Sequence, residues 1–179
     1  MFNTLKLIEI LEQAPNSKKI QQLIRAAENE SSVNLAKQLD ELRGVWELRW
    51  SSSKSPLLNY NPLLDNLQIL DPEKNRGINF LRPRGILGKI FSTNIRAKLD
   101  IIDQKRIDVT FEKVGIKGPQ LLGKAIGLSS EIKKTQKGWL DTSVLSNKLR
   151  VCKGYKGTTF ALLKREDLSL DDFFNNINS

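Results

Sequence analysis

The chain has 179 residues and a formal net charge of +9, and it contains no histidine and one cysteine. The absence of histidine excludes Ser-His-Asp and Cys-His catalysis and histidine-ligated zinc, and the lone Cys152 excludes an internal disulfide. With 39% apolar and 27% charged residues, the composition is typical of a globular protein, and we expect one domain over residues 1–179.

Positive charge is concentrated in the middle of the chain. Residues 82–156 carry 17 basic and 6 acidic side chains, whereas residues 1–81 are balanced and residues 157–179 are acidic. A basic segment of this kind favours an anionic partner, either nucleic acid or an acidic membrane surface. The alternative is a solvated strand face rich in lysine and arginine.

The first 41 residues predict two or three short helices. Residues 1–13 contain acids and no small-residue cleavage site, so we expect a helix of the mature protein and not a signal or transit peptide. Helical spacing of apolar residues continues over residues 20–27 and 33–39, each after residues that can cap a helix. We expect these helices to pack on their own domain; binding to a membrane or a partner is the alternative. No apolar run approaches the roughly 18 residues of a membrane-spanning helix.

Residues 42–52, LRGVWELRWSS, have strict two-residue alternation after a G-x-W pair. Trp46, Leu48 and Trp50 fall on one face, which predicts a strand with an apolar, aromatic-rich side. The connection that follows, residues 51–66, contains too many apolar residues for a solvated linker and predicts a loop or short helix that closes over something. Two short strands are expected next, at residues 67–70 and 77–81.

Apolar and charged residues alternate most clearly over residues 95–101 and 107–111. The five residues between them, with Asp103 in the centre, predict a hairpin loop. One apolar and one charged face per strand is typical of an antiparallel sheet with a dry side. Many strands in series, with helices confined to one end, favour a closed or nearly closed barrel.

The stretch from Gly118 to Lys124 matches G-x-x-x-x-G-K. A phosphate-binding loop also needs Ser or Thr at the next position and a helix behind it, but Ala125 follows here. We interpret the stretch as turn and bulge glycines with a loop at the barrel mouth.

The last strands are expected at residues 149–152 and 158–163, joined by a tight turn. The acidic tail, residues 166–179, predicts one short helix around Phe173 and Phe174.

Two sequence blocks carry a family resemblance. The first block is a leucine-glycine-x-tryptophan strand followed by serines: Leu42, Gly44, Trp46, Leu48, Ser51 and Ser52. The second block is a leucine-arginine run, a lysine-glycine turn and a phenylalanine strand: Leu149, Arg150, Val151, Lys153, Gly154, Lys156, Gly157 and Phe160. In these blocks the chain resembles the plastid lipid-associated protein family, also called fibrillins, over about residues 5–165.

The chain departs from the family pattern at four positions. Ser146 and Lys148 stand where the family usually has acidic residues, and Tyr155 replaces an acidic residue in the turn. Val144 stands where a tyrosine is common. Any role of those acids in the family is therefore in doubt for this chain.

The resemblance implies a mainly β fold, a lipocalin-like antiparallel β-barrel over residues 42–165, preceded by two or three short α-helices in residues 1–41 and followed by the tail. It also implies binding of a small hydrophobic molecule, such as a lipid, quinone or carotenoid, at thylakoid membranes or lipid globules, with no enzymatic activity, cofactor or metal. The expected location is cytoplasmic or peripheral on those membranes, in a cyanobacterial-type member without a transit peptide.

Two groups of residues are candidates for the barrel itself. By the lipocalin pattern, Gly44 and Trp46 would close one end, with a late-strand cation across the ring; Arg150 fits this role better than Arg165. The candidate cavity lining is Trp50, Phe80, Leu99, Val109, Phe111 and Phe160, although sequence does not fix which strand face looks inward.

A third group would dock the protein on anionic lipid head groups, each cation contributing up to about 1 kcal/mol. The candidate cations are Arg82, Arg84, Lys89, Arg96, Lys98, Lys133, Lys134 and Lys137.

Two other functions remain open at this point. A barrel that binds single-stranded nucleic acid would fit the pI near 9.7, but it needs exposed aromatics among its basic residues. A lipocalin-like bilin lyase would need an acid facing the cavity, for which Asp141 and Glu131 are the only suggestions.

Overall fold

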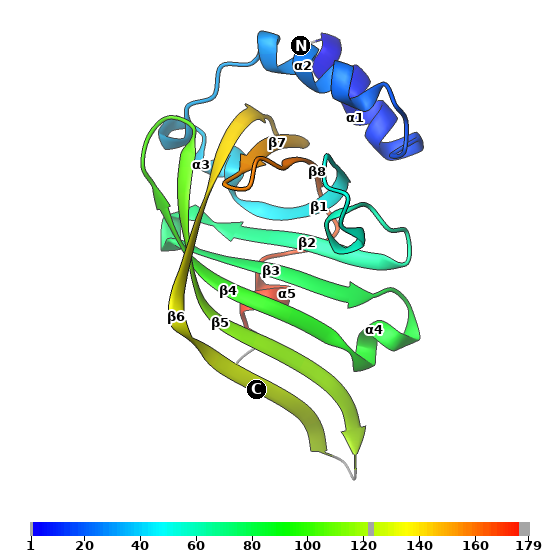
Figure 1. The fold of residues 1–179 in the computed structure, drawn as a ribbon, viewed down its shortest axis with the longest axis vertical. Helices are drawn as coiled ribbons and strands as arrows, with labels where there is room; N and C mark the ends of the chain where they lie inside the picture. The colour runs from blue at the N-terminus through cyan, green and yellow to red at the C-terminus, as the bar shows by residue number, and fades with distance from the viewer. Residues whose placement is uncertain (1, 122–123, 176–179) are drawn as a thin grey trace.

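In the computed structural model, which describes residues 2–121 and 124–175, eight antiparallel strands follow one another around a closed barrel. Each strand pairs with its neighbours in sequence, and β1 closes the barrel on β8 (Figure 1). The strands are β1 (Gly44–Ser51), β2 (Leu64–Asp71), β3 (Arg76–Pro83), β4 (Ser92–Ile101), β5 (Arg106–Leu121), β6 (Lys124–Leu145), β7 (Leu149–Gly154) and β8 (Thr159–Lys164). The predicted mainly β barrel with N-terminal helices is confirmed.

Alternation along β4 and β5 separates the barrel interior from its outer face. Ala97 pairs with Phe111 and Leu99 with Val109, and all four belong to the interior apolar cluster or pack against it. The loop between the two strands is held by Asp103, whose Oδ1 accepts two backbone N–H groups at 2.7 and 2.9 Å. The hairpin predicted from the sequence is therefore present.

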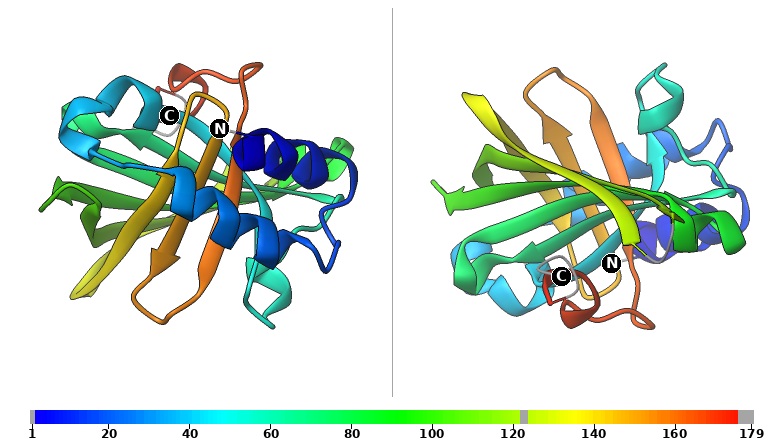
Figure 2. Two further views of the ribbon diagram at one scale, coloured as in Figure 1. Left: turned by 90° about the horizontal axis from the view of Figure 1, so that it is seen from above. Right: turned by 90° about the horizontal axis from the view of Figure 1, so that it is seen from below.

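The helices α1 (Phe2–Gln13) and α2 (Ile20–Glu30) lie across the outer face of β7 and β8 (Figure 2). Their apolar faces share one cluster with outward-facing strand residues: Leu7, Leu11, Ile20, Ile24, Ala27, Val144, Leu149, Val151, Ala161 and Leu163. Packing on their own domain, the first expectation for these helices, is confirmed.

One end of the barrel is closed by the segment between α2 and β1. This segment contains the 3₁₀ turn η1 (Leu35–Lys37) and the short helix α3 (Leu39–Leu42), where the sequence predicts one helix. Leu35 and Leu42 are fully buried in the interior cluster beside Trp46. The backbone N–H of Leu35 donates to the carbonyl of Gln104 at 2.9 Å, which ties the segment to the β4–β5 loop.

The C-terminal helix α5 (Asp171–Phe174) covers a different part of the outer wall (Figure 1). Phe173 is buried against residues of β1, β2 and β3: Val45, Leu67, Ile69 and Ile78. The helix predicted around Phe173 and Phe174 is confirmed. The remaining short elements are η2 (Pro56–Leu58), η3 (Pro72–Lys74) and α4 (Ile86–Ile90).

The bulge expected within residues 118–124 is present, since the pairing of β5 with β6 shifts register between Lys117 and Gln120. β5 continues to Leu121 and pairs there with Lys124 of β6, because the backbone ladder of this hairpin extends past the end of β4. Residues 122 and 123 lie outside the described residues.

The wall has a seam between β6 and β7. β6 is 22 residues long and β7 only six, and in the described ladder β7 pairs with residues 140–145 of β6. The rest of β6 pairs on one side, with β5, and runs away from β7 toward the tip of the long hairpin (Figure 1). Neighbouring strands are therefore hydrogen-bonded all the way around the barrel only toward its closed end.

Candidate functional site

A cavity of about 520 Å³ occupies the barrel interior, opposite the closed end. Most of its wall is apolar and comes from the inward positions of six strands: Leu48, Leu70, Ile95, Ala97, Leu99, Val109, Phe111, Leu140, Phe160 and Leu162. This volume lies within the range of small-molecule sites, about 300–1,000 Å³. Burial of apolar surface is therefore the interaction that the cavity offers most.

Four of the six predicted lining residues border this cavity with their side chains inside. Leu99 and Val109 are buried in the interior cluster, and Phe111 and Phe160 pack against it. Phe160 is brought to the wall by β8, where it pairs with Ser51 and Cys152.

Phe80 borders the cavity along β3, but its ring packs on the outer face. The ring centroid lies 5.2 Å from that of Phe173 in a T-shaped contact, and Phe80 packs on the outer cluster under α5. Its aromatic ring is therefore not a cavity contact, because α5 provides an apolar partner on the opposite side of the wall.

The prediction that Trp50 lines the cavity is wrong. The pairing of β1 with β8 shifts register between Leu48 and Trp50, which is a β-bulge. A bulge puts one extra residue into the strand and reverses the alternation beyond it. Trp50 consequently packs on the outer cluster beneath α1 and α2, opposite Ala161.

Trp46 is fully buried at the closed end of the barrel. Its Nε1–H donates to the carbonyl of Leu42 at 2.9 Å. Two cations lie over its ring: Arg150 Cζ at 5.6 Å and Lys164 Nζ at 4.9 Å from the centroid. Lys164 also donates to the carbonyls of the α3–β1 junction, and burial lowers the pKa of its ammonium group.

Gly44 permits this arrangement. It has φ +144°, a conformation that side chains of L-residues rarely adopt, and a Cβ at this position would lie 3.1 Å from Lys164 Cε. Arg165, the other candidate for the tryptophan ring, points away from it and pairs with Asp167.

Arg150 makes the main polar contact at the closed end of the cavity. Its side chain is 1% exposed, and Nη2 donates to Oε1 of Gln68, which itself lines the cavity. Nε and Nη1 of Arg150 have no hydrogen-bond partner among the residues that the structure describes. Sequence analysis missed Gln68, although a glutamine between Leu67 and Ile69 was the available signal for a polar inward position.

The mouth of the cavity is covered in part by the connection between β1 and β2. Leu57 and Leu58 of η2 line the cavity, and Asn66 Nδ2 donates a hydrogen bond to the carbonyl of Leu57 at 2.9 Å. Tyr155, one of the departures from the family pattern, lies at the same end of the cavity. Its ring packs on Gly138, where an added Cβ would lie 3.0 Å from Tyr155 Cδ1. The expectation that residues 51–66 close over something agrees with this placement.

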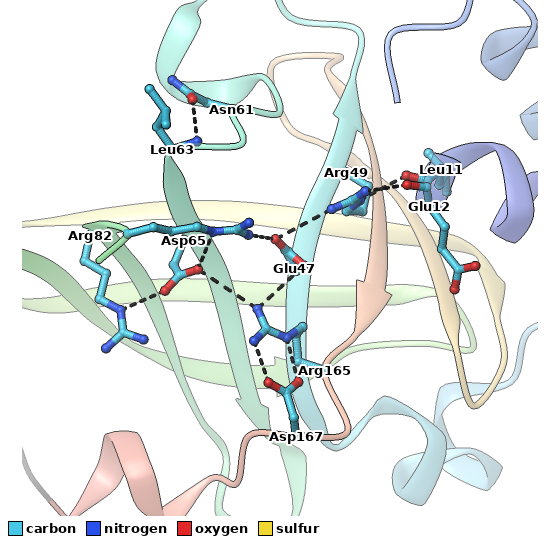
Figure 3. A network of polar contacts seen from close by, with 11 residues as sticks. Leu11, Glu12, Glu47, Arg49, Asn61, Leu63, Asp65, Arg82, Arg165 and Asp167 are labelled. Atoms are coloured by element: carbon cyan, nitrogen blue, oxygen red, sulfur yellow. Dashed lines mark hydrogen bonds and ion pairs between the residues drawn. The ribbon is translucent and has the colours of Figure 1, made fainter. Parts of the chain in front are cut away.

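A second hollow, of about 510 Å³, lies on the outer face and is charged. The buried carboxylates of Glu47 and Asp65 are bound there by arginines at the end of β3, just after β3 and just after β8 (Figure 3). Asp65 accepts from Arg82 at 2.8 Å and from Arg84 at 2.9 Å, and Arg84 also pairs with Glu47. Arg82 and Arg84, expected to dock on lipid, are thus engaged within the protein.

Asp167 extends this network at its exposed edge (Figure 3). It forms a bidentate pair with Arg165, at 2.7 and 2.6 Å, which lowers the pKa of the Asp167 carboxyl to about 2. Arg165 Nη1 lies 3.7 Å from Glu47, so the tail is connected to the buried acids.

Other predicted docking cations share one outer surface. Lys98 of β4 pairs in register with Thr110 of β5, and Thr110 pairs with Lys137 of β6, so the three form a row across the outer wall. Lys98 is 52% exposed and is partnered by Asp100 at 2.8 Å. Arg96 lies two positions from Lys98 on the same strand face. The side chains of Lys89, Lys133 and Lys134 lie outside the described part of the structure.

The acids suggested for a lyase do not meet in the cavity. Asp141 faces outward and forms a bidentate pair with Arg106, at 2.7 and 2.8 Å. Glu131 is exposed and lies opposite Lys113 in the outer hairpin. Among the described residues no group of three potential metal ligands occurs, and none of their helices is long and apolar enough to cross a membrane.

Comparison with known proteins gives one match. The PAP_fibrillin family model matches residues 10–163, which include all eight strands except the last residue of β8. No curated protein and no solved structure matches the chain.

Proposed function

Because this chain belongs to the PAP_fibrillin family, we propose that it binds a small hydrophobic molecule, such as a lipid, quinone or carotenoid, in the barrel cavity and carries or retains it at a membrane or lipid globule. The observation that supports this proposal most is the apolar cavity of about 520 Å³ inside the wall. Apolar surface that a ligand buries there contributes about 25 cal/mol per Å², offset by the cost of immobilising the ligand.

Blocking the cavity tests this function directly. Thr93 lines the cavity on β4 and has no side-chain hydrogen bond within the described structure, so Thr93→Trp fills space near the mouth. Thr110→Trp, on the outward face of β5, is the matched control. We expect the first variant to lose at least tenfold in affinity for a fluorescent apolar probe and the second to bind normally.

The identity of the ligand follows from extraction of the protein from its native cell. Lipid or pigment should copurify with the wild-type chain and be depleted from Thr93→Trp. If neither variant nor wild type binds any apolar probe, quinone, carotenoid or galactolipid, the proposed function fails.

Membrane contact is the second part of the proposal. The row that contains Lys98 and Lys137 gives the outer wall a positive surface that complements anionic lipid, at up to about 1 kcal/mol per cation. We expect binding to vesicles with anionic lipid that weakens with salt and is reduced by Lys98→Glu with Lys137→Glu. Equal binding to neutral and anionic vesicles would contradict this docking surface without affecting the cavity.

A further inference from the structure

The buried charge of Arg150 has no counterion within the described structure. No carboxylate there lies within ion-pair distance of its guanidinium, and its close polar contacts are Gln68 Oε1 and, at 3.7 Å, Cys152 Sγ. The guanidinium of an arginine carries a delocalised positive charge. The Trp46 ring and the Gln68 oxygen contact this cation, but neither carries a negative charge. A buried cation without a counterion is costly, which leaves the interior of this barrel electrostatically prepared for an anion.

Gln68 connects this charge with the cavity. Its side chain faces inward, since its neighbours Leu67 and Ile69 both pack in the outer cluster under α5. A guanidinium only donates hydrogen bonds, so Gln68 must turn its oxygen toward Arg150. The amide NH₂ group is then left to donate, and no described residue accepts a hydrogen bond from it.

The two groups form a polarised chain that ends in the cavity. Arg150 withdraws electron density from the Gln68 carbonyl and makes the amide N–H groups stronger donors. Leu48, Leu70 and Leu162 in the surrounding wall are apolar, and the polar neighbour of Gln68 is the uncharged amide of Asn79, its register partner on β3. An acceptor at this end would therefore meet these amides, with the charge of Arg150 directly behind Gln68.

We propose that the closed end of the cavity is a head-group site for the carboxylate of a long-chain amphiphile, which enters head first and leaves its hydrocarbon chain toward Leu57 and Leu58 at the mouth. Gln68 is the contacting residue, and Arg150 is a positioning residue that fixes the amide orientation and supplies the positive potential. The inference rests on the proposed function, because it assigns a ligand class to that same cavity.

Three ligands of equal chain length test the head-group preference: a fatty acid, the corresponding alcohol and the corresponding amine, each measured by displacement of a fluorescent apolar probe from the full chain. We expect the fatty acid to bind at least tenfold more tightly than the alcohol, and the amine more weakly than both. If acid and alcohol bind equally, the head-group site is overturned while the cavity function stands. If none of the three displaces the bound probe, the head-group site is likewise overturned, whereas failure of the probe itself to bind would count against the proposed function.

Gln68→Glu separates the head-group site from general packing. The new carboxylate would pair with Arg150, so we expect an unchanged or higher melting temperature, a loss of at least tenfold in fatty-acid affinity and unchanged affinity for the alcohol. Gln22→Glu is the matched control, because it makes the same amide-to-acid change at an exposed position of α2, away from the cavity. If Gln68→Glu fails to fold, Gln68→Met should still lose the preference for acid over alcohol; a retained preference would overturn the proposal.

Discussion

Leu48 and Trp50 lie two positions apart on β1, yet their side chains are on opposite sides of the barrel wall. Leu48 belongs to the interior cluster and lines the cavity, whereas Trp50 packs beneath the N-terminal helices. The bulge between them allows Arg49 to face outward as well, where it donates to the carbonyls of Leu11 and Glu12 at the end of α1 (Figure 3). The bulge therefore adds two residues of β1 to the contacts that attach the helices to the barrel.

Trp50→Ala should destabilise the protein without reducing ligand affinity. The substitution removes a partly buried aromatic ring from the contact with α1 and α2, which should lower the free energy of unfolding by about 2–3 kcal/mol. Urea unfolding and probe binding measure the two effects. Trp139→Ala, on the outer face away from the helices, should cost less; a loss of probe affinity in Trp50→Ala would contradict its placement.

Trp46→Phe should cost about 1–2 kcal/mol of unfolding free energy. The variant keeps an aromatic ring at the closed end but removes the Nε1–H donor, so the buried carbonyl of Leu42 loses its partner. Chemical denaturation measures this cost. Trp50→Phe is the control because the structure gives Trp50 no side-chain hydrogen bond among the described residues, and equal costs for both variants would argue against the role of the Trp46 hydrogen bond.

Gly44→Ala should destabilise the fold by about 1–3 kcal/mol, because alanine is strained at φ +144° and its Cβ would approach Lys164. The melting temperatures of Gly44→Ala and of the wild-type protein measure this loss of stability. Gly127→Ala on β6 should be nearly neutral, since its Cβ would meet only one atom, at 3.9 Å. A neutral Gly44→Ala would mean that the start of β1 can relax.

Asp167→Asn should destabilise the protein at neutral pH and have no effect in strong acid. The folded pKa of Asp167, about 2, is below its ordinary value of 3.8 because of the Arg165 hydrogen bonds. Its contribution is therefore complete above about pH 4 and is lost as the pH falls through 2. Since the side chain is 63% exposed, solvent screening limits the effect to less than about 1 kcal/mol.

Unfolding midpoints of wild type and Asp167→Asn between pH 7 and pH 2 test this linkage. The two curves should converge toward the acid end, and added salt should narrow the gap at pH 7. A gap that stays constant down to pH 2 would exclude the ion pair as its cause.

The sequence predicted the barrel and much of its wall because one face of β4 and β5 is apolar and the other is charged. Leu99, Val109 and Phe111 follow from that alternation alone. β2 and β3 do not obey the same rule, since α5 covers their outer face. Leu67, Ile78 and Phe80 therefore point toward α5, and some of the inward positions, including Gln68 and Asn79, are left to polar residues.

Because the apolar face of β2 is its outward face, sequence analysis missed the inward position of Gln68. A strand with an apolar face shows its periodicity but not the side on which its partner lies, and the partner of β2 is separated from it by some 100 residues of chain. Gln68 was consequently not singled out within the short strand predicted at residues 67–70. The bulge at Trp50 also leaves no signal in the sequence, because the alternation of residue types continues unbroken through it.

The seam between β6 and β7 affects how copies of this protein meet one another. Over the described residues 127–138, β6 has backbone hydrogen bonds on one side only, and a free strand edge can accept a strand from another molecule. The exposed Lys137 gives every copy the same charge at that edge, which opposes such pairing. Because salt screens this charge, the tendency of copies to aggregate through the free edge of the long hairpin depends on ionic strength.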